Sequence, residues 1–291
     1  MKTKVLAGAS SIRAWICFFV AAMSSAAALA EEKPDAWQFQ ITPYIWLPTI
    51  EGSLRYQPPP GGGGGPDIAL GPTDWLDLLN IGALVAASAK KGRYSILTDA
   101  VYLSLTAKND GRVISVDDNI SVPGTPIRVP VNITATLDTQ LDLDGLAWTL
   151  AGGYSIKENE RSSIDLIAGV RYFGVDTTTS WSLDAAITTP GGTVLLPAEG
   201  STDRDVDLWD GIIGSRGHVR IGEGKWLAQY YVDVGTGSSD LTWTAMGALA
   251  YEFGWGDVVL AYRHLEYDQD AGGLFQGFSF SGPGLGARFR F

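Results

Sequence analysis

The sequence predicts an all-β fold, a transmembrane antiparallel up-and-down β-barrel, and three observations lead to it. Apolar and polar residues alternate in segments of roughly ten residues, the length that a tilted strand needs to cross a bilayer. The chain has 36 Gly and 10 Trp, and Trp and Tyr gather near the ends of the alternating segments, as in the aromatic girdles of membrane barrels. The chain also ends in an alternating strand pattern with a terminal aromatic residue.

Alternation gives each segment two chemically different faces. In residues 241–253 the odd positions, from Leu241 to Phe253, are apolar or aromatic with one Gly, whereas the even positions include Thr242, Thr244 and Glu252. One face suits lipid and the other suits a lumen. The same pattern recurs in residues 37–46 and 226–235.

Residues 1–30 are typical of a secretory signal peptide. A basic start precedes an apolar run that ends in a small-x-small cleavage pattern. Cys17, the one cysteine of the chain, lies inside this segment. We therefore expect an exported barrel domain at residues 31–291 without disulfides or thiol chemistry. The net charge of −11 argues against nucleic acid as a partner.

The turn pattern predicts the topology. Short polar turns alternate with long stretches rich in Gly, Pro, Thr and Asp, which is the expected asymmetry of short periplasmic turns and long external loops. The short turns lie at 90–93, 157–162, 222–225 and 254–257. We expect about 10 strands with both termini in the periplasm; 8 or 12 also fit, because "GSLRY" and "VNITATL" read as extra strands or as extensions above the membrane. The expected strands are 37–48, 81–90, 93–106, 140–155, 163–176, 206–221, 226–238, 240–253, 257–268 and 277–291.

Residues 49–80 are expected to form one external loop. The Pro/Gly-rich stretch at 56–66 is incompatible with regular structure, because Pro removes donors and Gly adds backbone entropy. The following "TDWLDLLN" predicts a short helix with Thr73 as its N-cap and an apolar side that includes Trp75. We expect this helix to decorate the loop rather than to enter the barrel mouth.

Three segments repeat Asp and Arg at an even spacing, with small and apolar residues between: "DLIAGVR", "DGIIGSR" and "DVVLAYR". On a strand this spacing places both charges on one face, and because charge is costly against lipid, that face should be the lumen. The predicted lumen charge network is Asp165, Arg171, Asp210, Arg216, Asp257 and Arg263. One antiparallel register sets Asp165 opposite Arg216 and Arg171 opposite Asp210; unpaired charges lining a wet pore are the alternative.

The C-terminus "GPGLGARFRF" places Phe291 and Phe289 on one face and Arg290 and Arg288 on the other. It resembles the closing strand of Gram-negative outer-membrane barrels, whose final aromatic residue is part of the signal read by the assembly machinery. This resemblance implies that Phe291 and Phe289 form an assembly signal and that the barrel assembly machinery is a partner.

The chain as a whole resembles a broad, largely uncharacterised, porin-like family of proteobacterial outer-membrane β-barrels. The resemblance implies the barrel and its location in the Gram-negative outer membrane, in contact with lipid and lipopolysaccharide, and brings no activity or catalytic residue with it. Where the family often has Tyr, this chain has His264. The segments that carry the resemblance are "TPYIW", "DWLDLL", "KKGRYSILTDAVYLSL", "AGVRYFG", "LWDGIIGSRGHVRIGEGKWLAQYYVDVG", "YRHLEYD" and "GPGLGARFRF".

The expected function is a narrow porin-like channel for small solutes, not an enzyme. Eight-stranded barrels are filled by side chains and sixteen-stranded porins hold water, so about 10 strands lie near the filled limit. The alternative is a packed barrel that anchors surface loops for a structural or adhesive role.

A barrel hydrolase acting on lipid or peptide is a third reading, with His218 and His264 as the available bases. Alternation places His264 and Glu266 outward near the external rim, where a serine would complete a hydrolase site, and His218 inward. The ordinary role of an interfacial His is that of an amphipathic anchor. We expect no cofactor and no metal, since the acidic loops at 116–119 and 267–273 lack calcium-loop spacing, although they could share cations with lipopolysaccharide phosphates.

Deleting Phe291 should lower the amount of folded, heat-modifiable protein in the outer membrane, because the terminal aromatic residue should be part of the recognised strand. Export across the inner membrane should stay unchanged. The measurement is the ratio of folded to unfolded bands in membrane fractions. An unchanged ratio would contradict the proposed role of the terminus.

Overall fold

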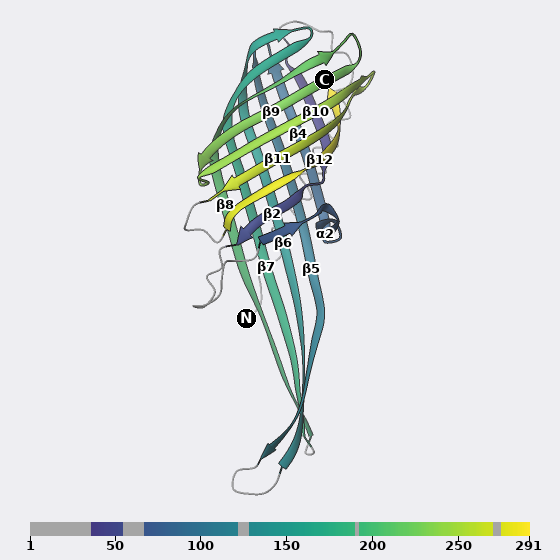
Figure 1. Cartoon of the computed structure of the whole chain (residues 1–291), viewed down its shortest axis with the longest axis vertical. Helices are drawn as coiled ribbons and strands as arrows, with labels where there is room; N and C mark the ends of the chain where they lie inside the picture. Colours follow the sequence, from purple (N-terminus) through teal and green to yellow (C-terminus); the bar gives the residue numbers. More distant parts are fainter. Residues whose placement is uncertain (1–35, 55–66, 122–127, 190–191, 270–274) are drawn as a thin grey trace.

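The computed structural model describes residues 36–54, 67–121, 128–189, 192–269 and 275–291, and its main feature is one antiparallel sheet that closes on itself (Figure 1). β1 (Gln38–Trp46) pairs with β4 on one side and with β12 on the other, and the strands between follow in chain order. The chain is therefore a closed up-and-down barrel, as predicted; the number of strands that cross a membrane stays a prediction. The remaining ring strands are β4 (Leu79–Lys91), β5 (Tyr94–Ser121), β6 (Arg128–Asn159), β7 (Ser162–Thr189), β8 (Gly192–Ile221), β9 (Trp226–Gly237), β10 (Leu241–Phe253), β11 (Gly256–Asp268) and β12 (Phe275–Arg290).

Four tight turns join the ring strands at one end of the barrel, which we call the short-turn end: β4–β5, β6–β7, β8–β9 and β10–β11. They fall where the sequence predicts them. Gly92 and Gly222 have φ of 56° and 62°, a conformation that glycine adopts without a Cβ penalty. The expected signal peptide at residues 1–30 and the Pro/Gly stretch at 56–66 lie outside the described residues.

The expected long loops at the other end are in large part strand. β5, β6, β7 and β8 have 28, 32, 28 and 30 residues and continue as a four-stranded extension beyond the barrel (Figure 1). β4 accompanies β5 only as far as Leu105, and β9 accompanies β8 only as far as Asp210. The predicted strand ends near 106, 140, 176 and 206 are therefore wrong, whereas the alternative that "VNITATL" extends a strand agrees with its place in β6. This segment and "TTTSWS" in β7 carry β-branched residues, which favour strands.

β1 continues past a break into β2 (Thr49–Leu54), which pairs with β12 in the same register as β1. The break lies at Leu47 and Pro48, where the Leu47 amide still donates to the Pro283 carbonyl at 3.0 Å. β3 (Asp67–Leu70) then pairs with β2. The segment expected to be one loop thus widens the sheet beside β12.

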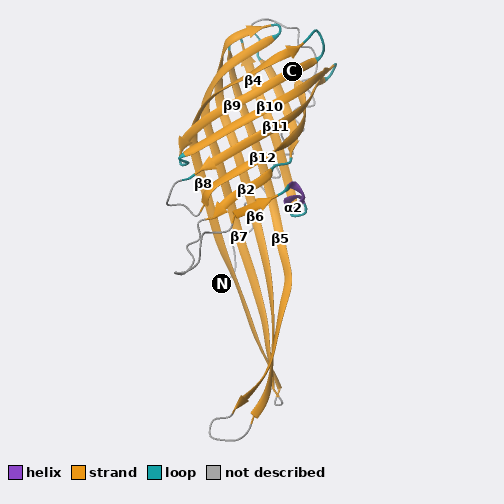
Figure 2. Cartoon of the chain, in the orientation of Figure 1, coloured by secondary structure: helices purple, strands orange, loops and turns teal. Residues whose placement is uncertain are grey.

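One helix, α2 (Pro72–Leu76), follows β3 (Figure 2). Its N-cap is Gly71 rather than Thr73, because Pro72 takes the first helical position, where its missing N–H is no loss. Trp75 is buried, and its indole N–H donates to the Pro48 carbonyl at 2.9 Å. The helix is therefore docked at the strand break and does not merely decorate a loop. In the part of the chain that the structure describes, no helix is long and apolar enough to span a membrane.

The two faces of the wall differ as the alternation predicts. Large apolar side chains such as Ile45, Leu249 and Leu260 point outward and are 62%, 45% and 56% exposed, whereas inward neighbours such as Ala250 and Leu265 are buried. Closing the ring pairs the backbone of both terminal strands, so the wall presents side chains rather than open hydrogen-bonding edges.

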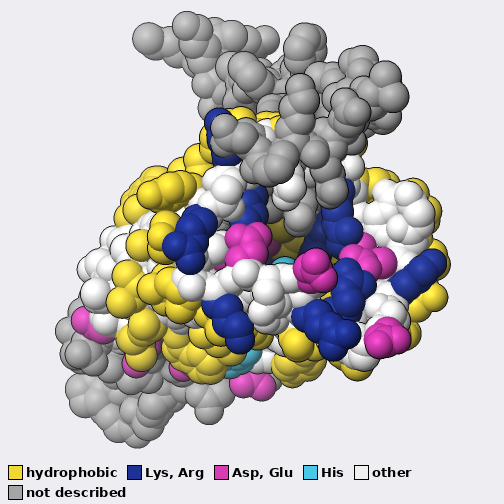
Figure 3. Space-filling view, turned by 90° about the horizontal axis from the view of Figure 1, so that it is seen from above, with side chains coloured by type: hydrophobic (Ala, Val, Ile, Leu, Met, Phe, Trp, Pro, Cys, Tyr) yellow, Lys and Arg dark blue, Asp and Glu magenta, His cyan; other side chains and the backbone are white. Residues whose placement is uncertain are grey.

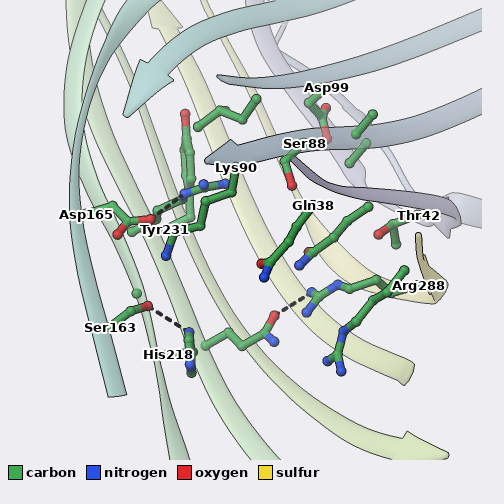
Figure 4. A pocket seen from close by; sticks show the side chains of 18 of the residues that line it. Gln38, Thr42, Ser88, Lys90, Asp99, Ser163, Asp165, His218, Tyr231 and Arg288 are labelled. Atoms are coloured by element: carbon green, nitrogen blue, oxygen red, sulfur yellow. Dashed lines mark hydrogen bonds and ion pairs between the residues drawn. The ribbon is translucent and has the colours of Figure 1, made fainter. Parts of the chain in front are cut away.

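Val85→Arg and Ser88→Arg on β4 should separate the two faces. Val85 points outward, so an arginine there should cost about 2–4 kcal/mol in a bilayer. Ser88 lines the interior (Figure 4), where a charge meets polar groups and should cost less. Urea unfolding in lipid vesicles measures both values, and equal costs would contradict a lipid-facing outer surface.

Candidate functional site

The barrel interior holds a cavity of about 740 Å³ that opens toward the short-turn end, and we call it the vestibule. Viewed from that end, basic and acidic side chains are mixed around the centre and apolar side chains lie on the outside (Figure 3). Gln38 on β1, Ser88 and Lys90 on β4, His218 on β8 and Arg288 on β12 project into the cavity (Figure 4). The vestibule is therefore a polar chamber formed by the inward residues of the ring.

At the mouth of the vestibule, ion pairs connect neighbouring and more distant strands. Asp257 accepts from Arg290 at 2.5 Å and from Arg288 at 3.5 Å. Glu252 accepts from Arg220 at 2.5 Å and also from Arg290 at 3.4 Å. Asp257 is one of the predicted network residues, and its partners come from β12 rather than from the arginine in its own septet.

The first predicted pair forms. β7 and β8 are in the register that the sequence predicts, with Asp165 opposite Arg216 and Arg171 opposite Asp210. Arg216 Nε lies 3.2 Å from Asp165 Oδ2, and Arg216 also donates to Ser95 Oγ on β5 at 3.1 Å. This arginine therefore joins β8 to β7 and to β5 across the interior.

The predicted ion pair between Arg171 and Asp210 is wrong. Arg171 instead donates to Asp233 on β9 at 2.5 Å and to Thr242 on β10 at 3.1 Å. Both ends of the Arg171–Asp233 pair are buried. A long arginine can reach past its register partner, and a neighbour-by-neighbour pairing rule misses this.

Asp210 instead stabilises the β9–β10 turn. Its carboxylate accepts from the Ser239 backbone N–H at 2.8 Å and from the Ser239 hydroxyl at 2.9 Å. This leaves Asp233 as the anion for Arg171. Asp233 fits there because Gly214, opposite it on β8, has no side chain: a Cβ on Gly214 would lie 2.8 Å from the Asp233 Cβ.

Arg263 spans the lumen. From β11 it donates to Asp99 on β5 at 3.0 Å, and Tyr44 on β1 also donates to Asp99 at 3.0 Å. The Arg263 guanidinium carbon lies 5.0 Å from the ring centroid of Trp46, a cation–π geometry. Because β5 and β11 are separated by several strands on either side of the ring, these bonds cross the interior.

An apolar layer lies next to this network, toward the extension. Phe173 on β7 packs against Tyr267 on β11 at 4.8 Å between ring centroids and against Phe280 on β12 at 5.9 Å. Trp46, Val101, Phe173, Leu208, Leu265 and Tyr267 form one buried cluster. The Arg263–Asp99 ion pair and this cluster both cross the interior on the extension side of the vestibule.

The two histidines lie on opposite faces, as alternation predicts. His218 points into the vestibule, with Nδ1 2.7 Å from Ser163 Oγ. His264 lies on the outer wall, with Nδ1 2.5 Å from Ser281 Oγ and Nε2 3.2 Å from Glu266 Oε2.

The C-terminal residues close the ring. The Phe291 backbone exchanges hydrogen bonds with Phe39 at 2.9 and 3.0 Å, and Phe289 packs against Trp255 at 5.4 Å between ring centroids. Recognition of this strand by the assembly machinery stays a prediction.

Several residues that hold the interior together were not among the predicted network: Tyr44, Asp99, Asp233, Glu252, Arg288 and Arg290. Their inward position on a strand is the signal that could have found them, but their partners depend on ring closure. Among the described residues no group of three or more His, Cys, Asp or Glu side chains could hold a metal ion.

No protein-family model matches the chain, and no curated protein matches it. Among solved structures it is similar to the translocator domain of the autotransporter NalP from Neisseria meningitidis, at 11% identity over 97% of this chain and 98% of that chain, with a TM-score of 0.35. The transport unit of the autotransporter AIDA-I from Escherichia coli gives 9% identity, 95% and 97% coverage and a TM-score of 0.30. The P. putida toluene transporter TodX gives 11%, 89% and 90%, and 0.25.

A double-mutant cycle should show that Arg171 is coupled to Asp233 and not to Asp210. Removing either partner of the buried pair alone should cost about 3–5 kcal/mol, because the other charge stays buried and unpaired. The coupling of Arg171→Met with Asp233→Leu should be on the order of 1–3 kcal/mol, whereas Arg171→Met with Asp210→Asn should be nearly additive. Urea unfolding of the six proteins measures both, and a larger coupling to Asp210 would overturn the assignment.

Proposed function

We propose that the chain is an integral outer-membrane β-barrel whose lumen is closed by side chains and which carries a four-stranded extension on the outer side of the membrane. Three features support the membrane location: a closed ring, an apolar outward face and a polar interior. The short turns would then face the periplasm and the extension would face outward, as in other barrels of this kind.

The closure of the lumen is supported by the contacts that cross it. Arg263 binds Asp99 from the far side of the ring, and Phe173 packs against Tyr267 just beyond. Both layers lie between the vestibule and the extension. The barrel would act as a rigid anchor for the extension, with a structural or adhesive role at the cell surface.

A narrow, porin-like channel is the second candidate, and the vestibule favours it. It is a charged chamber of about 740 Å³ that opens to one side, a volume within the range of roughly 300–1,000 Å³ found for small-molecule pockets. Solute passage would require the Arg263–Asp99 bonds and the aromatic layer to move apart.

Planar-bilayer recordings of the refolded protein should distinguish the two candidates. A closed barrel should show no regular unitary steps, whereas Phe173→Ala combined with Tyr267→Ala should create them by removing the aromatic layer. Trp209→Ala, an exposed aromatic residue on the outer face, is the matched control and should stay silent. Regular ion-selective steps in the unmodified protein would reject the closed barrel and favour the channel.

A further inference from the structure

A polar cluster interrupts the apolar outer wall on β10, β11 and β12. Ser281 lies opposite His264 in the register, which explains the 2.5 Å contact between Ser281 Oγ and His264 Nδ1. Glu266 is two residues further along β11, on the same face, and its Oε2 lies 3.2 Å from His264 Nε2. We propose that these three residues form a serine-hydrolase site that cleaves carboxylic esters of membrane lipids.

The order of the contacts is that of a nucleophile, a base and an orienting group. With its proton on Nε2, His264 donates to Glu266 and presents a free Nδ1 lone pair to the Ser281 hydroxyl. Trp243 Nε1–H donates to Glu266 Oε2 at 3.0 Å, and the Trp243 and His264 ring centroids are 4.4 Å apart. Trp243 therefore holds both the carboxylate and the imidazole in place.

The second histidine of the chain provides an internal comparison. His218 also contacts a serine hydroxyl, Ser163 Oγ at 2.7 Å. Within the described ranges, no carboxylate bonds its other ring nitrogen. Of the two histidines, His264 is the one whose described partners make up the complete set of three groups. A purely anchoring role for His264 would not require Ser281 and Glu266 on either side of it.

The position of the cluster selects the substrate class. Tyr262 and Leu260 continue the outward face of β11 and are 58% and 56% exposed, so an acyl chain could lie along the wall beside the cluster. Glu266 and Trp243 are two residues from the ends of β11 and β10, near the level where headgroup esters meet a barrel rim. The side chains of His264 and Glu266 are 26% and 40% exposed, and so a lipid ester has access.

The reaction balances without a cofactor. Ser281 Oγ attacks the ester carbonyl carbon while its proton passes to His264 Nδ1, and the collapsing tetrahedral intermediate releases the alcohol, which takes that proton. Water then attacks the acyl-serine carbonyl and gives its proton to His264. The free acid leaves, and Ser281 regains its proton.

The test uses the full-length exported chain, refolded in detergent and in phosphatidylethanolamine–phosphatidylglycerol vesicles, with folding checked by heat-modifiable migration. An alkyl fluorophosphonate probe in detergent should label Ser281, as shown by peptide mapping. Fatty acid should be released from the vesicles. Ser281→Ala should abolish labelling and release, and His264→Ala should lower release at least about 100-fold.

Ser279→Ala is the matched control. Ser279 is the next outward residue on β12, opposite Glu266, and this variant should keep both labelling and release. Glu266 is a positioning residue: Glu266→Gln should lower kcat with little change in KM, and Glu266→Asp should restore part of the loss.

Absence of both labelling and release in folded protein, or equal release from the Ser281→Ala variant, would overturn the proposal. Labelling of Ser281 in detergent without release from vesicles would reject lipid esters as the substrate. Because labelling in detergent does not require the barrel to be in a membrane, failure of the hydrolase proposal is distinguishable from failure of the proposed membrane location.

Discussion

The pairing of β1 with β12 is the contact on which the rest of the structure depends. It closes the sheet, and a closed sheet has an inside and an outside that alternate residue by residue. Closure also brings together side chains that no local pattern relates, such as Arg263 on β11 and Asp99 on β5. Without closure these charges would lie on a solvated sheet face and would contribute little to stability.

Two rules govern the charges inside the ring: one determines which face a charged side chain lies on, and the other determines which partner it bonds. Only the first can be derived from the sequence. The even spacing within each Asp–Arg septet determines the face, and the antiparallel register puts Asp165 opposite Arg216. Partner choice follows a second rule, because long side chains bond whichever anion is left free across the interior. Arg171 selects Asp233, since Asp210 already holds the β9–β10 turn through Ser239. Sequence reasoning therefore predicts the register but cannot predict all the ion pairs.

The barrel wall, too, could be predicted from the sequence only in part. Four turns and the alternating faces could be predicted because both depend on short-range pattern and turn chemistry. The extension could be predicted only in part: "VNITATL" alternates as a strand does, whereas the neighbouring segments rich in Thr, Ser, Asp and Gly resemble loops by composition. Their strand form depends on β5 to β8 pairing with one another beyond the barrel, a contact that composition does not reveal.

The outer wall carries a polar cluster, of which alternation already places His264 and Glu266 outward and to which the structure adds Ser281. A carboxylate on an apolar face is costly, and removing Glu266 in favour of an apolar residue would cost the barrel nothing in closure or register. Its cost is reduced here by two donors, Trp243 and His264, which are themselves positioned by the register of β10 and β11. Ser281 then meets His264 because β12 continues that register. Two partners are enough to stabilise Glu266, so the third group, a hydroxyl bonded to the free side of the imidazole, is the part of the cluster that stability alone does not explain.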